Sequence, residues 1–167
     1  MKNAYKNIRA FALAAAVLTG ALFTATLCAQ QAPAPKAANL EEIAEKNFDK
    51  ALEASKADGK IAMLEFTGSQ WCPPCKMLHK FVLNTEEFVD FAKKNLHVIV
   101  LDFERSGTPV DKENAVKYEA LAQKYRIEGF PTIILIHPKT GEVKKYVGLQ
   151  FRNPQSLINE IKSFKGN

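Results

Sequence analysis

The sequence has few of the residues that metal centres and disulfide-stapled folds require. Its 167 residues include three cysteines and three histidines. Cys72 and Cys75 supply two of the four ligands of a structural zinc site, and although His79 follows one helical turn later, no further cysteine or clustered histidine completes the set. A bridge between them would close too short a loop to stabilise a fold much. Both structural uses of the pair are disfavoured, and no metal is expected.

The sequence also lacks an excess of charge and a nucleotide-binding motif. It carries 23 Lys and Arg against 18 Asp and Glu. Three of the basic residues, Lys2, Lys6 and Arg9, lie at the extreme N-terminus, so 20 basic side chains face 18 acidic ones in the remainder. This near balance gives no reason to expect nucleic acid as a partner. No glycine-rich nicotinamide or flavin motif is present, so no cofactor is expected beyond a redox-active Cys72–Cys75 disulfide.

An uncharged run, "AFALAAAVLTGALFTATLCAQQ", follows the basic residues at the N-terminus. This layout is typical of a secretory signal peptide over residues 1–29, with cleavage after Ala29. Residues 30–38, rich in Ala, Pro and Gln, predict a mobile tether, and residues 39–167 predict one globular domain. The expected location is periplasmic or otherwise exported.

Two alternatives to cleavage after Ala29 remain open. The apolar run approaches the roughly 20 residues of a membrane-spanning helix, so it can be retained as an anchor that faces the domain toward the periplasm. Cys28 can alternatively be lipidated, although Leu27 departs from the bacterial lipoprotein pattern. Contact with a membrane is expected only in these two cases. Cleavage after Ala29 would leave Cys72 and Cys75 as the only cysteines.

Hydrophobic periodicity predicts an α/β domain. Short apolar runs indicate strands buried on both faces, and the helix between the first two makes them parallel. "HPKTGEV" predicts a tight turn between two antiparallel strands. Helical spacing predicts one helix from Asn39 to Gly59 and a last helix capped by Asn153. The predicted result is a four-strand mixed sheet with helices on both faces, its strands being "IAMLEF", "HVIVLDF", "TIILIH" and "EVKKYV".

The cysteine pair lies where a buried strand ends and a helix begins. We expect the sulfur of Cys72 to be exposed there, and the helix N-terminus to favour its thiolate, which is the nucleophile in disulfide exchange. Cys75, one turn along, would attack the resulting mixed disulfide. Pro73 and Pro74 each remove an N–H group that could stabilise the thiolate. The pair is therefore predicted to be a reductant, with a potential nearer about −270 mV than about −120 mV.

Several motifs together resemble the thioredoxin family. These are "WCPPCK", the upstream "EFTGSQ", the downstream "YRIEGFPTIILI" and the Val147–Gly148 pair, and they span almost everything after the tether. More narrowly, the sequence is similar to exported bacterial thioredoxin-like proteins. The resemblance implies a thioredoxin fold and thiol–disulfide exchange.

The resemblance also implies roles for four further residues. Pro131 matches the cis-proline that shapes the family's substrate groove, with a trans strand-edge proline as the alternative. Phe130 should offer backbone groups to an extended substrate, and Trp71 matches the tryptophan beside the nucleophile. Glu65 lies near the position of a buried acid that deprotonates the second cysteine; the alternative is a buried carboxylate that is merely paired.

The sequence thus predicts an enzyme that reduces protein disulfides in the cell envelope. Its electrons would come from a membrane electron donor, and its partners would be substrate proteins with disulfides. The alternatives are a disulfide isomerase, a net thiol oxidase, or a redox-inactive module that binds peptides as a chaperone does. No dimerisation segment is evident, so a monomer is expected. His79, His97 and His137 are predicted to be ordinary surface or core residues.

Overall fold

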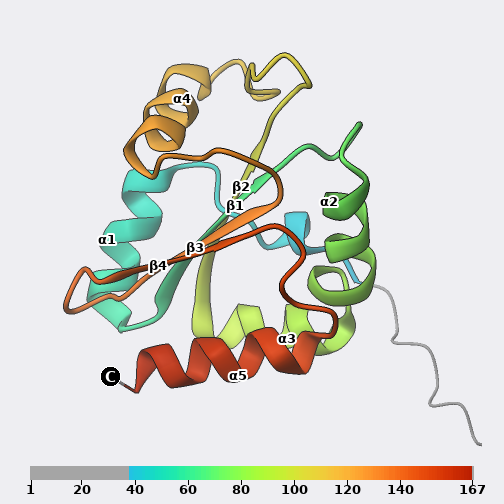
Figure 1. The fold of residues 1–167 in the computed structure, drawn as a ribbon. Coiled ribbons are helices and arrows are strands. Elements are labelled where there is room, and N and C mark those ends of the chain that lie inside the picture. The colour runs from blue at the N-terminus through green and yellow to red at the C-terminus, as the bar shows by residue number, and fades with distance from the viewer. Residues whose placement is uncertain (1–37, 167) are drawn as a thin grey trace, which may run out of the picture. The chain divides into compact units, whose positions relative to one another are not determined.

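A computed structural model describes residues 38–166 of the chain (Figure 1). The predicted signal peptide, and the predicted tether apart from Ala38, lie outside the described residues. Within residues 38–166, no helix combines the length and the apolar character needed to cross a membrane.

Four strands form one mixed sheet in the order β2-β1-β3-β4. β1 pairs in parallel with β2, while β3 pairs antiparallel with both β1 and β4. The four-strand mixed sheet predicted from the apolar runs is therefore confirmed. The strands are β1 (Ile61–Thr67), β2 (Leu96–Asp102), β3 (Thr132–Ile136) and β4 (Val143–Val147).

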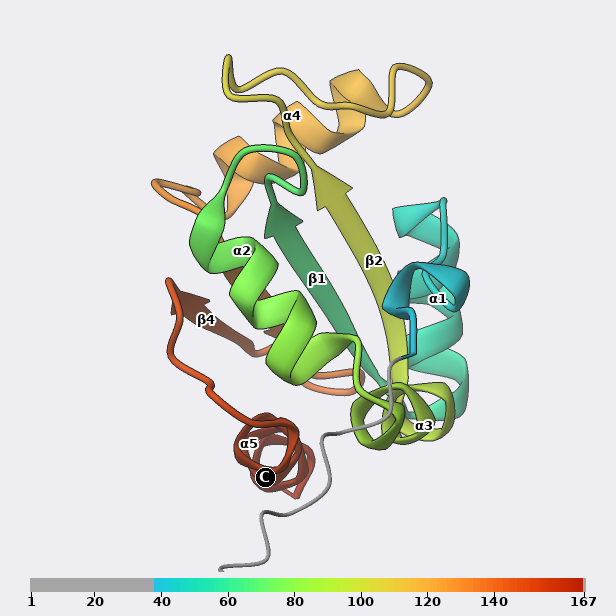
Figure 2. The ribbon, with the colours of Figure 1, turned by 90° about the vertical axis from the view of Figure 1, so that its right-hand side faces the viewer.

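Helices cover both faces of this sheet, as the two views of the ribbon show (Figures 1 and 2). One hydrophobic core contains residues of α1 and α4, and the other contains residues of α2, α3 and α5. A short 3₁₀ helix, η1, precedes α1, and a π-helical segment, η2, follows α2. The bounds are η1 (Leu40–Glu42), α1 (Phe48–Asp58), α2 (Pro73–Leu78), η2 (His79–Leu83), α3 (Glu86–Asn95), α4 (Ala115–Lys124) and α5 (Pro154–Lys165).

The single helix predicted from Asn39 to Gly59 is wrong, because the chain forms η1 and α1 separately. Asn39 caps η1, and a second asparagine, Asn47, caps α1 by accepting a hydrogen bond from the Lys50 nitrogen. Between them, the backbone nitrogen of Glu45 donates to the carbonyl of Val98 in β2 at 2.7 Å. That bond aligns the chain with the edge of the sheet instead of continuing a helix. Gly59 ends α1 in the left-handed conformation, with φ of 74°, as glycine commonly does.

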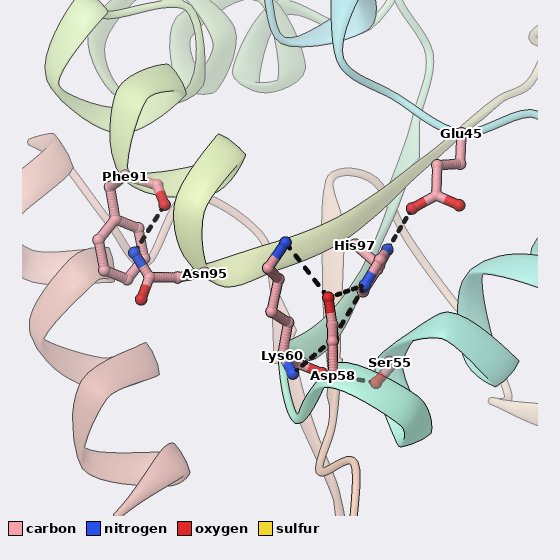
Figure 3. Close-up of polar contacts among 7 residues, drawn as sticks. All are labelled: Glu45, Ser55, Asp58, Lys60, Phe91, Asn95 and His97. Atoms are coloured by element: carbon pink, nitrogen blue, oxygen red, sulfur yellow. Dashed lines mark hydrogen bonds and ion pairs between the residues drawn. The ribbon is translucent and has the colours of Figure 1, made fainter.

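Side-chain bonds hold the segment before α1 to the rest of the fold (Figure 3). His97 of β2 lies between two carboxylates, bonding Glu45 through Nδ1 and Asp58 through Nε2. Asp58 also accepts a hydrogen bond from the backbone nitrogen of Lys60. Earlier in the segment, Leu40 is fully buried in the core under α2 and its nitrogen donates to the side chain of Asn84. The domain therefore includes residues well before α1.

Alternation along β1 decides which side chains face α2. Ile61 and Met63 belong to the core that includes α2, whereas Leu64 and Phe66 belong to the core under α1 and α4. Because successive side chains of a strand point to opposite faces, Glu65 and Thr67 also point toward the α2 side. Glu65 is fully buried there.

Candidate functional site

The cysteine pair lies at the first turn of α2, just beyond the C-terminal end of β1. Cys72 is the N-cap residue, and Pro73 and Pro74 occupy the first two helical positions. Cys72 and Cys75 form a disulfide with their Cα atoms 5.3 Å apart. The Sγ atom of Cys72 accepts a hydrogen bond from the backbone nitrogen of Cys75 at 3.3 Å. Since the prolines have no N–H groups, this bond is the capping contact that the helix start makes to the sulfur.

Cys72 is more enclosed than the sequence suggested. Cys75 is fully buried, as expected of a residue that faces the core, but Cys72 is only 3% exposed in the disulfide form. The expectation that the sulfur of Cys72 is openly exposed is therefore wrong. The reason is that its side chain folds back as the helix cap onto Cys75 and does not project away from the helix end.

Trp71 is fixed in place by three groups around its indole ring. Its Nε1 donates a hydrogen bond to the carbonyl of Phe103 at 2.8 Å, and its ring packs edge-on against that of Phe130. Arg105 lies over the indole with its guanidinium 5.8 Å from the ring centre. Gly68 makes room for this arrangement, because a Cβ atom there would lie 2.6 Å from the ring.

An aspartate and a serine that the sequence did not single out hold the loop before the cysteines. Asp102 ends β2 and accepts two bonds from Ser69, one from its backbone nitrogen at 2.8 Å and one from its hydroxyl at 2.6 Å. The sequence could have indicated Asp102, because parallel strands end at the same edge of a sheet and this residue closes the second predicted strand. In the structure Asp102 is paired in register with Thr67 of β1.

Phe130 and Pro131 lie immediately before β3. The peptide bond between them is cis, which is the conformation that the resemblance implied. The ring of Phe130 also packs near that of Phe103, with the centroids 5.5 Å apart. The carbonyl of Pro131 accepts a hydrogen bond from the nitrogen of Gly148, which joins this turn to the end of β4.

Glu65 forms an ion pair with His79, which was predicted to be a surface or core residue without a role in the site. The Oε1 atom of Glu65 lies 2.7 Å from Nε2 of His79, whose side chain is 14% exposed. Burial opposes the charged form of His79, but the hydrogen bond and charge of Glu65, with the charges of Glu41 and Asp102, outweigh it and raise its pKa above the ordinary 6.5. His79 follows Cys75 by four residues, a spacing that places both on one helix face.

The described residues contain no metal-binding arrangement of side chains. Across residues 38–166, no group of three or more His, Cys, Asp or Glu side chains is placed to hold a metal ion. Cys72 and Cys75 are instead joined by the disulfide described above.

The family model for the thioredoxin-like domain matches residues 48–164. This chain belongs to the thioredoxin-like family. The match includes both cysteines, all four strands and every helix from α1 to the last turn of α5, so the thioredoxin fold expected from the motifs is confirmed.

Relatives of this thioredoxin-like protein include bacterial and plant proteins. It is 31% identical over 134 residues to a disulfide bond reductase, DsbH, of Chlamydia pneumoniae, covering 80% of this chain and 78% of that one. It is 30% identical over 112 residues to an H-type thioredoxin of Oryza sativa subsp. indica, covering 66% of this chain and 76% of the relative.

Solved structures agree with this assignment. A structure of DsbH oxidoreductase superposes with a TM-score of 0.64 at 28% identity, covering 82% of this chain and 91% of that chain. A thioredoxin from Thermus thermophilus superposes with a TM-score of 0.51 at 24% identity, over 70% of this chain and 82% of that one, and shows the shared fold. This thioredoxin-like protein is a thiol–disulfide oxidoreductase.

Proposed function

We propose that this enzyme reduces disulfide bonds of exported proteins, with Cys72 as the nucleophile and Cys75 as the resolving thiol. The observation that carries the assignment is the N-cap position of Cys72, whose sulfur accepts a hydrogen bond from the nitrogen of Cys75. The same N–H group and the positive end of the helix dipole would stabilise a thiolate at this atom. Cys75 is fully buried whereas Cys72 keeps an exposed fraction of 3%, so Cys72 is the better placed of the two for the first attack on a protein substrate.

The reaction transfers two electrons from the enzyme to the substrate. The Cys72 thiolate attacks one sulfur of the substrate disulfide, forms a mixed disulfide and releases the other sulfur as a thiolate. Cys75 then loses its proton and attacks the sulfur of Cys72. The bond between Cys72 and the substrate breaks, and the second substrate sulfur leaves as a thiolate. The Cys72–Cys75 bond forms, and the substrate thiolates take up protons from water.

The residues around the disulfide support a groove for an extended substrate chain. Trp71 and Phe130 pack together beside the cysteine loop, and Pro131 follows Phe130 through the cis peptide bond. In this proposal, Phe130 offers its backbone groups to the substrate and Trp71 borders the reacting sulfur. Such main-chain pairing does not depend on the substrate's sequence, which suits an enzyme that acts on more than one protein.

The direction of electron flow is argued from the helix start. With Pro73 and Pro74 at its first two positions, the helix lacks two N–H groups that would otherwise favour the Cys72 thiolate. A less stabilised thiolate makes the dithiol a better electron donor. The printed name of the Chlamydia pneumoniae relative, a disulfide bond reductase, agrees with this direction.

The place of action is proposed from the N-terminal sequence. The basic residues and the apolar run over residues 1–29 are typical of a secretory signal, which would deliver the domain to the periplasm. Each turnover leaves the enzyme oxidised, so a membrane protein that passes electrons outward would have to restore the dithiol. Mass spectrometry of the N-terminus of the purified protein would distinguish cleavage after Ala29 from a retained anchor or a lipidated Cys28.

Two assays test the proposal. Insulin reduction driven by dithiothreitol should require both cysteines, and Cys75→Ser should accumulate mixed disulfides that a Cys72→Ser variant does not form. A protein that only binds peptides would keep its partner after both cysteines became serine, and would show neither result. The equilibrium potential against glutathione then sets the direction, since a value above the range of about −200 to −230 mV would exclude a reductant.

A further inference from the structure

We propose that His79 is the outlet through which the proton of Cys75 leaves the protein, with Glu65 as the link between them. The proposal rests on the function proposed above, in which Cys75 must lose its proton before it resolves the mixed disulfide. In this proposal the Glu65–His79 ion pair carries the proton from Cys75 to solvent. Glu65 alone, or an ion pair that only stabilises the fold, would not do this.

The first observation is the position of Glu65 under α2. Its carboxylate is fully buried and lies on the face of β1 that packs against α2. It contacts His79, whose backbone nitrogen donates to the carbonyl of Cys75 one turn earlier. Helical side chains lean toward the N-terminus of their helix, so the ring of His79 leans back toward the turn that carries Cys75. We infer that the Glu65 carboxylate lies between β1 and α2, on the side of the helix to which the side chains of Cys75 and His79 belong.

The second observation is an oxygen atom of Glu65 that has no partner. Oε1 bonds His79, but Oε2 is buried without any hydrogen bond within residues 38–166, and so is Oγ1 of Thr67 on the same face of β1. Buried polar atoms are rarely left unpaired, and each exception calls for an explanation. We infer that Oε2 is left as a free acceptor on the α2 side of β1, where it could take the proton of the Cys75 thiol.

The third observation is the route from His79 to solvent. The ring lines an open cavity of about 290 Å³ together with Ser69, Lys76, Lys80 and Asn84. An imidazole can receive a proton on one nitrogen and release it from the other, and its ordinary pKa near 6.5 suits such a transfer at neutral pH. His79 therefore connects a fully buried carboxylate with the surface of the protein.

The proton balance of the resolving step follows. Glu65 takes the proton of Cys75 at Oε2 and gives one to Nε2 of His79 at Oε1. His79 releases a proton to the cavity, and the electron pair left on Cys75 forms the bond to Cys72 while the substrate sulfur departs. His79 acts through Glu65, so it is a positioning residue and not a catalytic one.

The charges around His79 set the pH range of this relay. Glu65 of β1, Glu41 of η1 and Asp102 of β2 favour the protonated ring, and they raise the pKa of His79 against the effect of burial. Lys76 and Lys80 line the same cavity and are the cations on that side. Because the pKa of His79 is raised, we expect the ring to release its proton at a pH above the ordinary histidine pKa of 6.5.

Stopped-flow fluorescence separates the resolving step from the first attack. Trp71 is the only tryptophan of the chain, so its signal reports formation of the Cys72–Cys75 bond after mixing with a disulfide-bonded model peptide. We expect His79→Gln, which can still donate to Glu65, to slow resolution at least about tenfold and to lose the break in the pH–rate profile above pH 6.5. Glu65→Gln should slow it more, and the double variant no further, because the two groups act in series.

His97→Gln is the matched control, because His97, like His79, is a histidine paired with a carboxylate (Figure 3). It lies in β2 opposite Ala62, near the start of β1, whereas the cysteines follow the other end of that strand. Its resolution rate should equal that of the natural protein. In the Cys75→Ser background, His79→Gln should leave the rate of mixed-disulfide formation at Cys72 unchanged. Equal slowing of both steps would show that the pair is only structural, and an unchanged pH profile would overturn the relay.

A measurement on the natural protein covers the case in which the variants do not fold. The pKa of His79, followed by NMR, should differ between the dithiol and disulfide forms, whereas that of His97 should not. Equal values for His79 would contradict the proposal. Failure of Cys75→Ser to trap any substrate would instead refute the proposed function, so the two failures are distinguishable.

Discussion

Asp102 holds Ser69 by two hydrogen bonds, one to the backbone nitrogen and one to the hydroxyl, at 2.8 and 2.6 Å. These bonds anchor the loop that leads from β1 to Cys72 onto the end of the neighbouring strand. We expect Asp102→Ala to lower the free energy of unfolding by about 1–3 kcal/mol, since it leaves a partly buried N–H group without its acceptor. Urea unfolding measures the loss, and the rate of insulin reduction should fall with it.

Asp90→Ala is the control for this prediction. Asp90 lies on α3, is 59% exposed and pairs loosely with Lys93 at 3.8 Å. An exposed pair of this kind contributes little, so the unfolding free energy should change by less than about 0.5 kcal/mol. Equal effects of the two substitutions would mean that the bonds to Ser69 do not hold the loop.

Gly68→Ala should disturb Trp71. A Cβ atom at residue 68 would lie 2.6 Å from the indole ring, so the ring must move and its bond to the carbonyl of Phe103 must lengthen or break. We expect a shifted fluorescence maximum, a loss of about 1–3 kcal/mol in unfolding free energy and slower disulfide exchange. In Gly129→Ala the nearest atom would be 3.9 Å away, and all three measurements should stay close to those of the natural protein.

Pro74→His should raise the reduction potential. The change restores an N–H group at the second helical position and adds a side chain that can carry positive charge beside the Cys72 sulfur, and both favour the thiolate. A rise of roughly 30 mV corresponds to about 1.4 kcal/mol for this two-electron couple, and an effect of this order is expected. Gln155→His introduces the same side chain at the second position of α5, behind Pro154, and should leave the potential unchanged.

The charge of His79 should make stability depend on pH. Its pKa is raised in the folded protein by Glu65, Glu41 and Asp102 in spite of burial. Such a group stabilises the fold fully below its unfolded pKa of about 6.5 and loses that contribution as the pH rises through the folded value. The destabilisation caused by His79→Gln should therefore be larger at pH 6 than at pH 9 in urea unfolding. A difference that grows with pH would contradict the assignment of charge.

Much of the fold follows from local patterns in the sequence. The strands were found because β3 is a nearly continuous apolar run and β1 is apolar up to Phe66 apart from Glu65, and the turn at Pro138 and Gly141 identified the hairpin of β3 and β4. The break between η1 and α1 was missed because apolar residues keep a helical spacing across it. What ends the helical path is a bond from Glu45 to Val98, which lies 53 residues along the chain and has no local signal.

The chemistry of the site divides in the same way. Cys72 and Cys75 are recognisable from their spacing, since both lie on one helical turn after a strand. The partners of Glu65 and Asp102 depend on how strand ends meet helix faces, which only the assembled sheet decides. His79 carried one usable sign, its spacing of four residues from Cys75, but a lone histidine at that spacing does not identify the carboxylate that it contacts.

The position of Leu40 means that the folding unit is longer than the family match, which begins at residue 48. Leu40 is entirely enclosed in the core beneath α2, and burial of a leucine is worth about 1.5–3 kcal/mol. Glu45 also covers part of the outer edge of β2. A fragment that begins at residue 48 would expose that edge of β2 and leave a cavity in the core under α2 where Leu40 lies. Fragments for crystallisation or assay should therefore retain the chain from Ala38 onward.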